Sequence, residues 1–241
     1  MNIESVNNPR VKEWVRLKEK KYRDITNTFL IEGDHLLKEA LKKNLVVEII
    51  GLDMEFEVAG IPFYLVNESI MKKITNQVSF SKVVAVCKKM DAKLINGNVC
   101  ILDNIQDPGN LGAIIRSALA FNIDTIILSD DTVDLYNEKV VRASEGMIFN
   151  LNFVKGDLTE IVADLKLKGY KIYGTNVLEG ANLKSVDFSG KIGIIVGNEG
   201  RGMSEYLNQY CDNLINILIN KSCESLNAAV AASIIFYEIN R

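Results

Sequence analysis

Three turns in the second half of the chain carry the side chains best suited to chemistry. The first, Asp107–Pro108–Gly109–Asn110, ends an apolar run and opens a helix pattern. The second follows the apolar run 194–196 and is rich in glycine, and the third precedes the last helix pattern. Polar side chains at a helix N-terminus either cap the helix or hold a phosphate or ribose. We therefore expect the three turns to meet at one sheet edge and to form a site for such a ligand.

Charged and polar side chains in these turns, or just beyond them, are the candidates for the reaction. Arg116 lies in a helix pattern with apolar neighbours, so its guanidinium needs either an anionic partner or a water-filled cleft, and a structural salt bridge is the alternative to a functional role. Glu199 lies inside Gly197–Asn198–Glu199–Gly200–Arg201–Gly202, which matches a dinucleotide-binding loop only loosely. Ser225 and Asn227 begin the last helix pattern. Capping alone explains Ser225 but explains Asn227 less well, because Asn is a poor helix former.

Composition indicates an ordinary globular protein. The chain has 241 residues, of which 48% are hydrophobic and 24% are charged, enough for one large domain or two smaller ones. No apolar run reaches the roughly 18 residues of a membrane span, and the N-terminus has no signal-peptide pattern, so we expect a cytoplasmic protein without a membrane partner. Four dispersed cysteines and a single histidine favour buried thiols and no metal site.

Positive charge is concentrated near the N-terminus, although the net charge of the chain is −3. Residues 8–23 hold seven basic and two acidic side chains, with Val11 and Trp14 at helical spacing between them. Such a patch can bind phosphates whatever the global charge, and the alternative is a solvated helix face. The candidate phosphate contacts are Arg10, Lys12, Arg16, Lys20, Lys21 and Arg23.

Alternating strand and helix patterns predict an α/β protein with two domains. The first domain covers residues 1–90, with strand patterns at 29–31, 46–50, 62–66 and 83–87. Residues 91–98 break the pattern with charge and turn residues and are the expected linker. In residues 99–241, strands are expected near 99–104, 125–129, 147–154, 170–175, 191–196 and 214–219, and helices near 110–121, 137–144, 157–168 and 225–239. This alternation predicts a mostly parallel sheet covered on both faces.

Together, the turns resemble the three signature motifs of the SpoU/TrmH-type RNA ribose 2′-O-methyltransferases of the SPOUT superfamily. The matching segments are 107–116, 197–202 and 224–227 with the Ala-rich helix that ends in Tyr237–Glu238. Residues 140–146 resemble the connecting segment of that family. Residues 8–41 resemble the ribosomal-protein-like substrate-binding domain that is often fused in front. The third strand departs from the common Ile-Pro-Met pattern, since this chain has Ile217–Leu218–Ile219.

The resemblance implies a small N-terminal ribosomal-protein-like α/β domain, a C-terminal α/β (trefoil) knot and a homodimer. It implies S-adenosylmethionine bound in the knot, in contact with Thr175, Gly197, Ile217 and Leu226. The implied catalytic residues are Asn110, Arg116, Glu199, Ser225 and Asn227. Methyl transfer to a ribose hydroxyl needs alignment more than covalent help. Arg116 is a poor base, so its expected role is to hold the target phosphate and stabilise the developing alkoxide.

Two questions about function stay open at this point. The fused N-terminal domain favours ribosomal RNA, with RNA-binding basic residues in segment 8–23, but transfer RNA is an alternative substrate. A non-catalytic RNA-binding or ribosome-assembly protein of the same fold is the alternative from another class, and the intact polar set argues against it. A nicotinamide dehydrogenase is excluded because no glycine-rich turn follows the first strand of the second domain.

Overall fold

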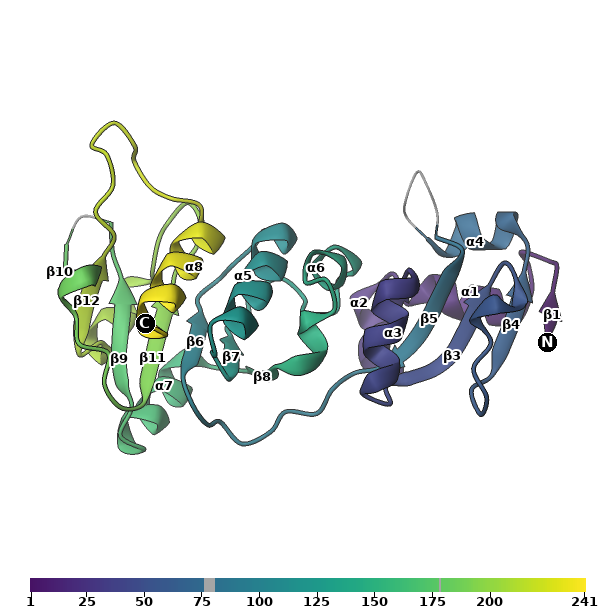
Figure 1. Cartoon of the computed structure of the whole chain (residues 1–241), viewed down its shortest axis with the longest axis horizontal. Helices are drawn as coiled ribbons and strands as arrows, with labels where there is room; N and C mark the ends of the chain where they lie inside the picture. Colours follow the sequence, from purple (N-terminus) through teal and green to yellow (C-terminus); the bar gives the residue numbers. More distant parts are fainter. Residues whose placement is uncertain (76–80, 178) are drawn as a thin grey trace. The chain divides into compact units, whose positions relative to one another are not determined.

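The computed structural model describes residues 1–75, 81–177 and 179–241. It consists of two compact units, which are Met1–Met90 with Asp134–Phe149, and Asp91–Val133 with Asn150–Arg241 (Figure 1). One unit holds a mixed sheet and the other a parallel sheet, which confirms the expected α/β class. The expected division into a domain at residues 1–90, a linker at 91–98 and a domain at 99–241 stays a prediction. No helix in the described residues is long and apolar enough to cross a membrane.

The N-terminal unit is built on a five-stranded mixed sheet of order β1-β4-β3-β5-β2. Its elements are β1 (Asn2–Ile3), α1 (Pro9–Arg16), α2 (Lys20–Thr26), β2 (Thr28–Glu32), α3 (Asp34–Lys42), β3 (Val46–Gly51), η1 (Met54–Phe56), β4 (Phe63–Val66), α4 (Glu68–Ile74), β5 (Val83–Lys88) and α6 (Glu138–Ala143), with η2 (Met147–Asn150) at the boundary. Strand β3 pairs with β4 in parallel and with β5 in antiparallel orientation.

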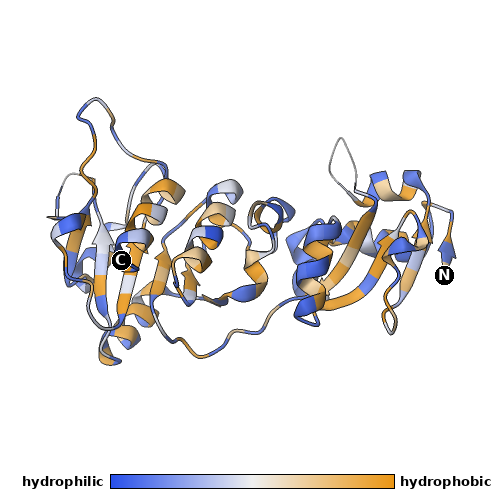
Figure 2. Ribbon diagram, in the orientation of Figure 1, coloured by the Kyte–Doolittle hydropathy of each residue, from blue (hydrophilic) through white to orange (hydrophobic). Residues whose placement is uncertain are grey.

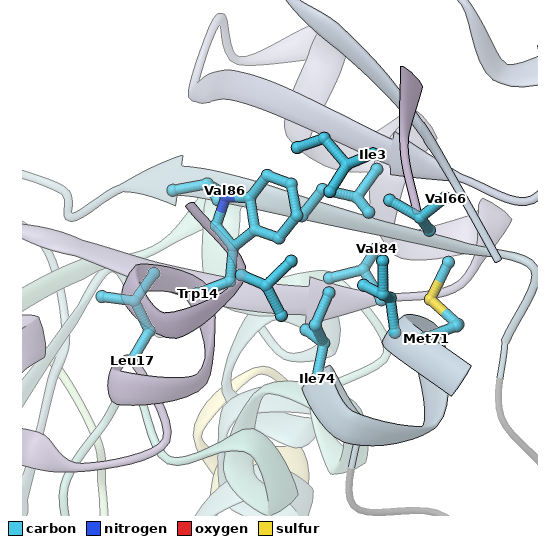
Figure 3. Packing of buried hydrophobic residues seen from close by; sticks show 11 residues of the cluster. Ile3, Trp14, Leu17, Val66, Met71, Ile74, Val84 and Val86 are labelled. Carbon is cyan, nitrogen blue, oxygen red and sulfur yellow. The ribbon is translucent and has the colours of Figure 1, made fainter. Parts of the chain in front are cut away.

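Helix α1 illustrates how the sequence fixes this unit. The Asn8 side chain accepts a hydrogen bond from the backbone N–H of Arg10, and Pro9 occupies the first helical position, so the helix starts where its cap predicts. Its buried face contributes Trp14 to the same hydrophobic cluster as Met71 and Ile74 of α4 (Figure 3). The Trp14 indole N–H donates to the carboxylate of Glu48 at 3.0 Å, which satisfies its one polar group. Trp14 is therefore a core residue.

The second unit is built on a seven-stranded sheet of order β10-β12-β9-β11-β6-β7-β8. Every strand pair in it is parallel. Its elements are β6 (Val99–Leu102), α5 (Pro108–Ala120), β7 (Thr125–Leu128), β8 (Asn152–Lys155), α7 (Leu158–Leu167), β9 (Lys171–Thr175), β10 (Ala181–Asn182), η3 (Leu183–Ser185), β11 (Ile192–Val196), η4 (Glu205–Tyr210), β12 (Asn213–Asn216) and α8 (Ala228–Ile239). The central strands β6, β7 and β11 are buried along their whole length and are largely apolar (Figure 2), as strands covered on both faces must be.

Helices pack on the sheet of the second unit and flank the three turns. Val99 and Ile101 of β6 pack with Val162 of α7 and Leu207 of η4. Helices α5 and α8 lie side by side (Figure 1) and are joined by a 2.6 Å hydrogen bond between the hydroxyls of Ser117 and Ser233. Because parallel strands all end at the same edge, the turns after β6, β11 and β12 are brought together there.

The structure differs from the predicted elements at three places. The apolar run 214–219 is strand only as far as Asn216, and residues 217–227 form a long loop in which Leu218 is 72% exposed (Figure 1). The predicted strand 147–154 is divided into η2 and β8. The last helix starts at Ala228, because the Asn227 side chain accepts hydrogen bonds from the N–H groups of its first turn and caps it.

Candidate active site

A cavity of about 530 Å³ lies where the turn after β11 and the loop after β12 meet. Its size falls within the range of roughly 300–1,000 Å³ that is typical of small-molecule sites. All four residues expected to contact a cofactor line it, namely Thr175, Gly197, Ile217 and Leu226. Sequence reasoning missed further lining residues, including Asn176, Met203 and Asn208. Only their closeness to the three turns could have indicated them.

The absence of a side chain at position 197 allows the turn after β11 to fold back on itself. A Cβ on Gly197 would lie 2.1 Å from the backbone N of Met203 and 2.2 Å from the backbone C of Gly202. Beyond it, Asn198 and Gly202 pair through two backbone hydrogen bonds of 2.9 Å each. These bonds close the turn and place Glu199 in the wall of the cavity.

The carboxylate of Glu199 is anchored at the N-terminus of α5. It accepts hydrogen bonds from the backbone N–H groups of Gln106 at 3.4 Å and Asp107 at 3.3 Å. The helix dipole favours a negative charge at this position. The side-chain amide of Asn110 donates to the same carboxylate at 2.8 Å. An ionised carboxylate can only accept, so Asn110 must turn its nitrogen toward Glu199 and its oxygen away.

Asn110 passes this orientation on to Asn227. Its side-chain oxygen accepts a hydrogen bond of 2.8 Å from the amide nitrogen of Asn227, whose own oxygen then caps α8. We call Glu199, Asn110 and Asn227 the amide relay. Each amide nitrogen in it has a second N–H that the relay does not use. The relay therefore offers oriented donors to an oxygen-rich ligand, and Glu199 acts as the group that orients them.

Two of the expected catalytic residues lie outside the amide relay. Ser225 lines the cavity, in the loop before α8. Arg116 is exposed on α5 and has no hydrogen-bond or ion-pair partner among the residues that the structure describes. It follows Asn110 by six helical positions, which correspond to a rise of about 9 Å and a rotation of about 240°. Arg116 thus leaves α5 in a different direction from Asn110.

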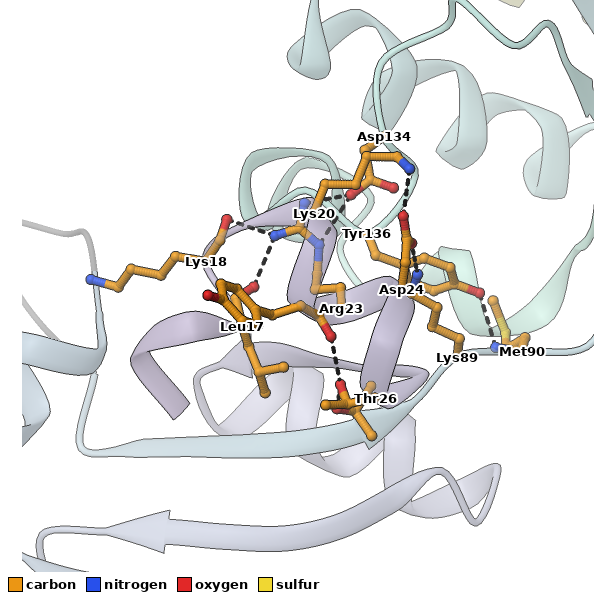
Figure 4. A network of polar contacts seen from close by, with 12 residues as sticks. Leu17, Lys18, Lys20, Arg23, Asp24, Thr26, Lys89, Met90, Asp134 and Tyr136 are labelled. Carbon is orange, nitrogen blue, oxygen red and sulfur yellow. Dashed lines mark hydrogen bonds and ion pairs between the residues drawn. The ribbon is translucent and has the colours of Figure 1, made fainter. Parts of the chain in front are cut away.

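The basic residues of segment 8–23 fall into two groups. Arg23 is only 5% exposed, and its guanidinium donates to the backbone oxygens of Leu17 and Lys18 and to the carboxylate of Asp134 at 2.5 Å (Figure 4). The role of Arg23 as an RNA contact stays a prediction, and in this structure its guanidinium is buried and paired with a carboxylate that lies far along the chain. Arg10 pairs with Glu13 and Glu48. The exposed members are Lys12, Arg16, Lys20 and Lys21.

Aromatic contacts accompany the exposed basic residues. The guanidinium of Arg16 lies 5.3 Å from the ring centre of Tyr22, and the ammonium of Lys21 lies 6.0 Å from it. Lys20 pairs with Asp24, which raises the pKa of Lys20 above its usual value and keeps it charged.

Within the described residues, no group of three or more His, Cys, Asp or Glu side chains is arranged to hold a metal ion.

Two family models match the chain. The SpoU rRNA Methylase family matches residues 97–237, and the MRM3-like substrate binding domain matches residues 8–85. Among curated proteins, the chain is 38% identical to the 23S rRNA (guanosine(2553)-2′-O)-methyltransferase RlmP of Bacillus subtilis, over 98% of this chain and 98% of that protein. The similarity therefore extends through both units.

Solved structures agree with this relationship. An AdoMet-bound rRNA methyltransferase from Sinorhizobium meliloti is 27% identical, covers 100% of this chain and 97% of its own, and superposes with a TM-score of 0.91. The SpoU methyltransferase AviRb from Streptomyces viridochromogenes, in complex with AdoMet, is 26% identical, covers 98% of both chains and has a TM-score of 0.87. The expected SPOUT fold class is thus confirmed. The chain belongs to the SpoU rRNA methylase family, whose members are S-adenosylmethionine-dependent RNA 2′-O-methyltransferases.

Proposed function

We propose that this protein methylates the ribose 2′-hydroxyl of a guanosine in 23S ribosomal RNA, at the position equivalent to guanosine 2553 of the Bacillus subtilis relative. The observation that carries this proposal is that Glu199, in the wall of a cavity of cofactor size, is hydrogen-bonded to Asn110 and through it to Asn227. The choice of substrate is supported by similarity that includes the N-terminal unit as well as the methylase part. Ribosomal RNA is made in the cytoplasm of bacteria, so we infer that the protein works there.

The residues that line the cavity suit S-adenosylmethionine. When bound, this cofactor supplies an electrophilic methyl group on a sulfonium centre. Gly197 brings backbone close to the cavity, since any side chain there would collide with the turn. Thr175 and Leu226 complete the walls, and Ile217 and Ile219 supply apolar surface that excludes water. The absence of Pro and Met at positions 218 and 219 does not remove any of these features.

The polar residues then act on the RNA. The amide relay holds its donors in a fixed orientation, and Ser225 adds a hydroxyl at the cavity that Glu199 also lines. Both can position the ribose so that its 2′-oxygen lies in line with the methyl group. The described hydrogen bonds of Glu199 make it an orienting group. Arg116 is permanently charged, and its proposed role is to bind the target phosphate and stabilise the alkoxide that develops as the 2′-hydroxyl passes its proton to solvent water.

We further propose a homodimer formed by the exposed side of α5 and α8. Val230 and Tyr237, seven positions apart on one face of α8, are 47% and 55% exposed. Tyr237 also contacts the ring of Phe121, at a centroid distance of 5.8 Å, which extends the apolar surface. Arg116 lies exposed on the neighbouring helix, about 240° around the axis of α5 from Asn110. A second copy of the chain would cover the apolar face and allow Arg116 to act in the partner's site.

Methylation of defined RNAs tests the proposal. The protein is incubated with tritiated S-adenosylmethionine and, separately, with 23S ribosomal RNA that lacks the modification and with unmodified transfer RNA, with Arg116→Ala as control. Alkali-resistant label at the proposed guanosine, absent with the variant, supports it. Label in transfer RNA alone overturns the substrate. Cofactor binding without label in free 23S RNA or in assembly intermediates that contain it favours a non-catalytic RNA-binding protein.

A further inference from the structure

The side chain of Asn198 makes four hydrogen bonds that tie the turn after β11 to the turn after β6. Its oxygen accepts from the backbone N–H groups of Gly200 at 2.9 Å and Arg201 at 3.1 Å. Its nitrogen donates to the backbone oxygen of Asn104 at 2.7 Å and, at 3.4 Å, to the carboxylate of Glu199. A side-chain amide has two acceptor positions and two N–H groups, so the full capacity of Asn198 is used.

The position of Asn104 is fixed by its backbone conformation and by hydrogen bonds of its backbone and side chain. Asn104 has a φ of 58°, in the left-handed region, which turns the chain sharply at the end of β6. Its backbone N–H donates to the Ser129 hydroxyl at 2.9 Å, and its side-chain oxygen accepts from the amide nitrogen of Gln106. The same nitrogen of Gln106 donates to the backbone oxygen of Asp131 at 2.6 Å. The acceptor that Asn198 uses therefore has a fixed position.

A second contact fastens the other end of the turn. The backbone N–H of Ser204 donates to the carboxylate of Asp103 at 2.7 Å, and Asp103 is buried at the end of β6. The turn that carries Glu199 is thus attached to residues 103 and 104 at both of its ends. Between these two attachments, the turn lines the cavity and presents Glu199 to Asn110.

We propose that Asn198 is a positioning residue for methyl transfer, which holds the turn 197–204 in the shape that both the cofactor cavity and the amide relay require. This inference deepens the proposed function and rests on it. The side-chain hydrogen bonds of Asn198 are all made within the protein, so its effect on the reaction passes through Glu199 and the backbone of the turn. Gln106 does not line the cavity and supports this arrangement indirectly, because its side chain holds Asn104, the acceptor that Asn198 uses.

The chemistry of the amide makes this role specific for Asn. Asn198→Asp keeps the acceptor oxygen for Gly200 and Arg201 but loses the donor to Asn104 and adds a negative charge beside Glu199. Asn198→Ala loses all four hydrogen bonds. Displacement of a reacting group by about 1 Å can lower the rate roughly 100-fold, and we expect a fall in kcat of that order for both variants, together with weaker cofactor binding.

Steady-state kinetics and calorimetric titration with S-adenosylmethionine test this role. The matched control is Asn182→Ala, because the Asn182 side chain, like that of Asn198, accepts from a backbone N–H two positions further on, that of Lys184 at 3.1 Å, and Asn182 does not line the cavity. We expect both Asn198 variants to lower kcat and to raise the Kd for S-adenosylmethionine, with unchanged kcat and Kd in the control. A Gln106→Ala variant should show a smaller change in the same direction, and it provides the test if the Asn198 variants do not fold.

The pH profile distinguishes positioning from general loss of stability. The charged groups on the two turns are Glu199, Arg201, Asp103 and Asp107. The introduced carboxyl of Asn198→Asp shares its site with Glu199, which favours a protonated form, and keeps the N–H donors of Gly200 and Arg201, which favour the ionised form. Protonation creates an O–H donor for the backbone oxygen of Asn104, so we expect kcat of Asn198→Asp, relative to Asn198→Ala, to rise as the pH falls.

Each outcome has a defined meaning. Wild-type protein that neither binds S-adenosylmethionine nor methylates RNA contradicts the proposed function itself. An active wild type, with folded Asn198 variants that have lower melting temperatures but unchanged kcat and Kd, overturns the positioning role. If the Asn198 variants do not fold, unchanged kcat and Kd in Gln106→Ala overturn it in the same way.

Discussion

The side-chain amide of Asn110 donates a 2.8 Å hydrogen bond to the carboxylate of Glu199, 89 positions further along the chain. The bond has a direction, because the carboxylate can only accept. Because the nitrogen of Asn110 faces Glu199, its side-chain oxygen faces Asn227 and accepts from the Asn227 amide nitrogen. The side-chain oxygen of Asn227 is then free to accept from the first turn of α8. A single charge therefore decides the orientation of two amides that crystallographic density alone rarely distinguishes.

Exchanging the donor and the acceptor tests this direction. Glu199→Gln removes the carboxylate, and Asn110→Asp places a second carboxylate against Glu199, so each single change should destabilise the protein. In the double variant, the new amide at position 199 can donate to the new carboxylate at position 110, which can still accept from Asn227. We expect a favourable coupling of about 1–3 kcal/mol in the double-mutant cycle, measured by urea unfolding. Additive destabilisation would show that the relay has no directional role.

Arg116 should be essential for transfer and dispensable for cofactor binding, because it does not line the cavity. Arg116→Ala is expected to abolish methylation while the Kd for S-adenosylmethionine stays nearly unchanged. If Arg116 acts in the partner's site, mixing inactive Arg116→Ala with inactive Asn227→Ala should restore about a quarter of wild-type activity, because half of the dimers are mixed and each has one complete site. A mixture that stays inactive despite exchange of subunits would place Arg116 in the site of its own chain.

Arg23 and Lys21 should behave in opposite ways when they are replaced. The side chains of Arg23 and Asp134 are 6% and 15% exposed, so Arg23→Met leaves a largely buried carboxylate without its partner and should cost about 3–5 kcal/mol of unfolding free energy. Lys21→Ala removes an exposed charge and should change stability by less than about 0.5 kcal/mol. It should instead weaken RNA binding and lower the slope of log K against log salt by about 1. Equal effects of both variants on RNA affinity would contradict this division.

The four cysteines should differ in their reaction with iodoacetamide, which attacks the thiolate. Burial raises the pKa of the Cys87 and Cys100 thiols, and it raises that of Cys211 to about 11. At about pH 8, only about one Cys211 side chain in a thousand is ionised, and this fraction grows as the pH rises. Cys223 is exposed in the loop before α8, so peptide mass spectrometry should find it alkylated first. Rapid labelling of Cys211 at the same pH would contradict this order of reactivity.

Local signals in the sequence predicted most of the elements. The parallel sheet followed from apolar runs such as 191–196 that alternate with helix patterns, and the start of α1 followed from Asn8 and Pro9. The run Ile215–Ile219 misled the prediction, because apolar character alone does not distinguish a strand from a loop that lines a cavity. In the structure, Ile217 and Ile219 face the cavity while Leu218 is exposed.

Contacts between distant residues were beyond what the pattern could provide. Arg23 has the same helical spacing as its exposed neighbours, and only the folded chain brings it to Asp134. The two turns joined by Asn198 are likewise separated by 94 residues, counted from Asn104 to Asn198. The cavity-lining residues Gly197 and Leu226 were assigned from a family resemblance, since spacing alone does not reveal which loops meet.

The segment Asp134–Phe149 belongs to the N-terminal unit, although the residues on both sides of it belong to the other unit. Tyr136 in this segment packs against Phe29, with ring centroids 4.5 Å apart. Gly146 has a φ of +78°, and a Cβ there would lie 2.9 Å from the Glu39 side chain. A chimera that exchanges only residues 1–90 between family members would therefore join mismatched surfaces. A chimera that folds must exchange residues 134–149 together with residues 1–90, because the two segments form one structural unit.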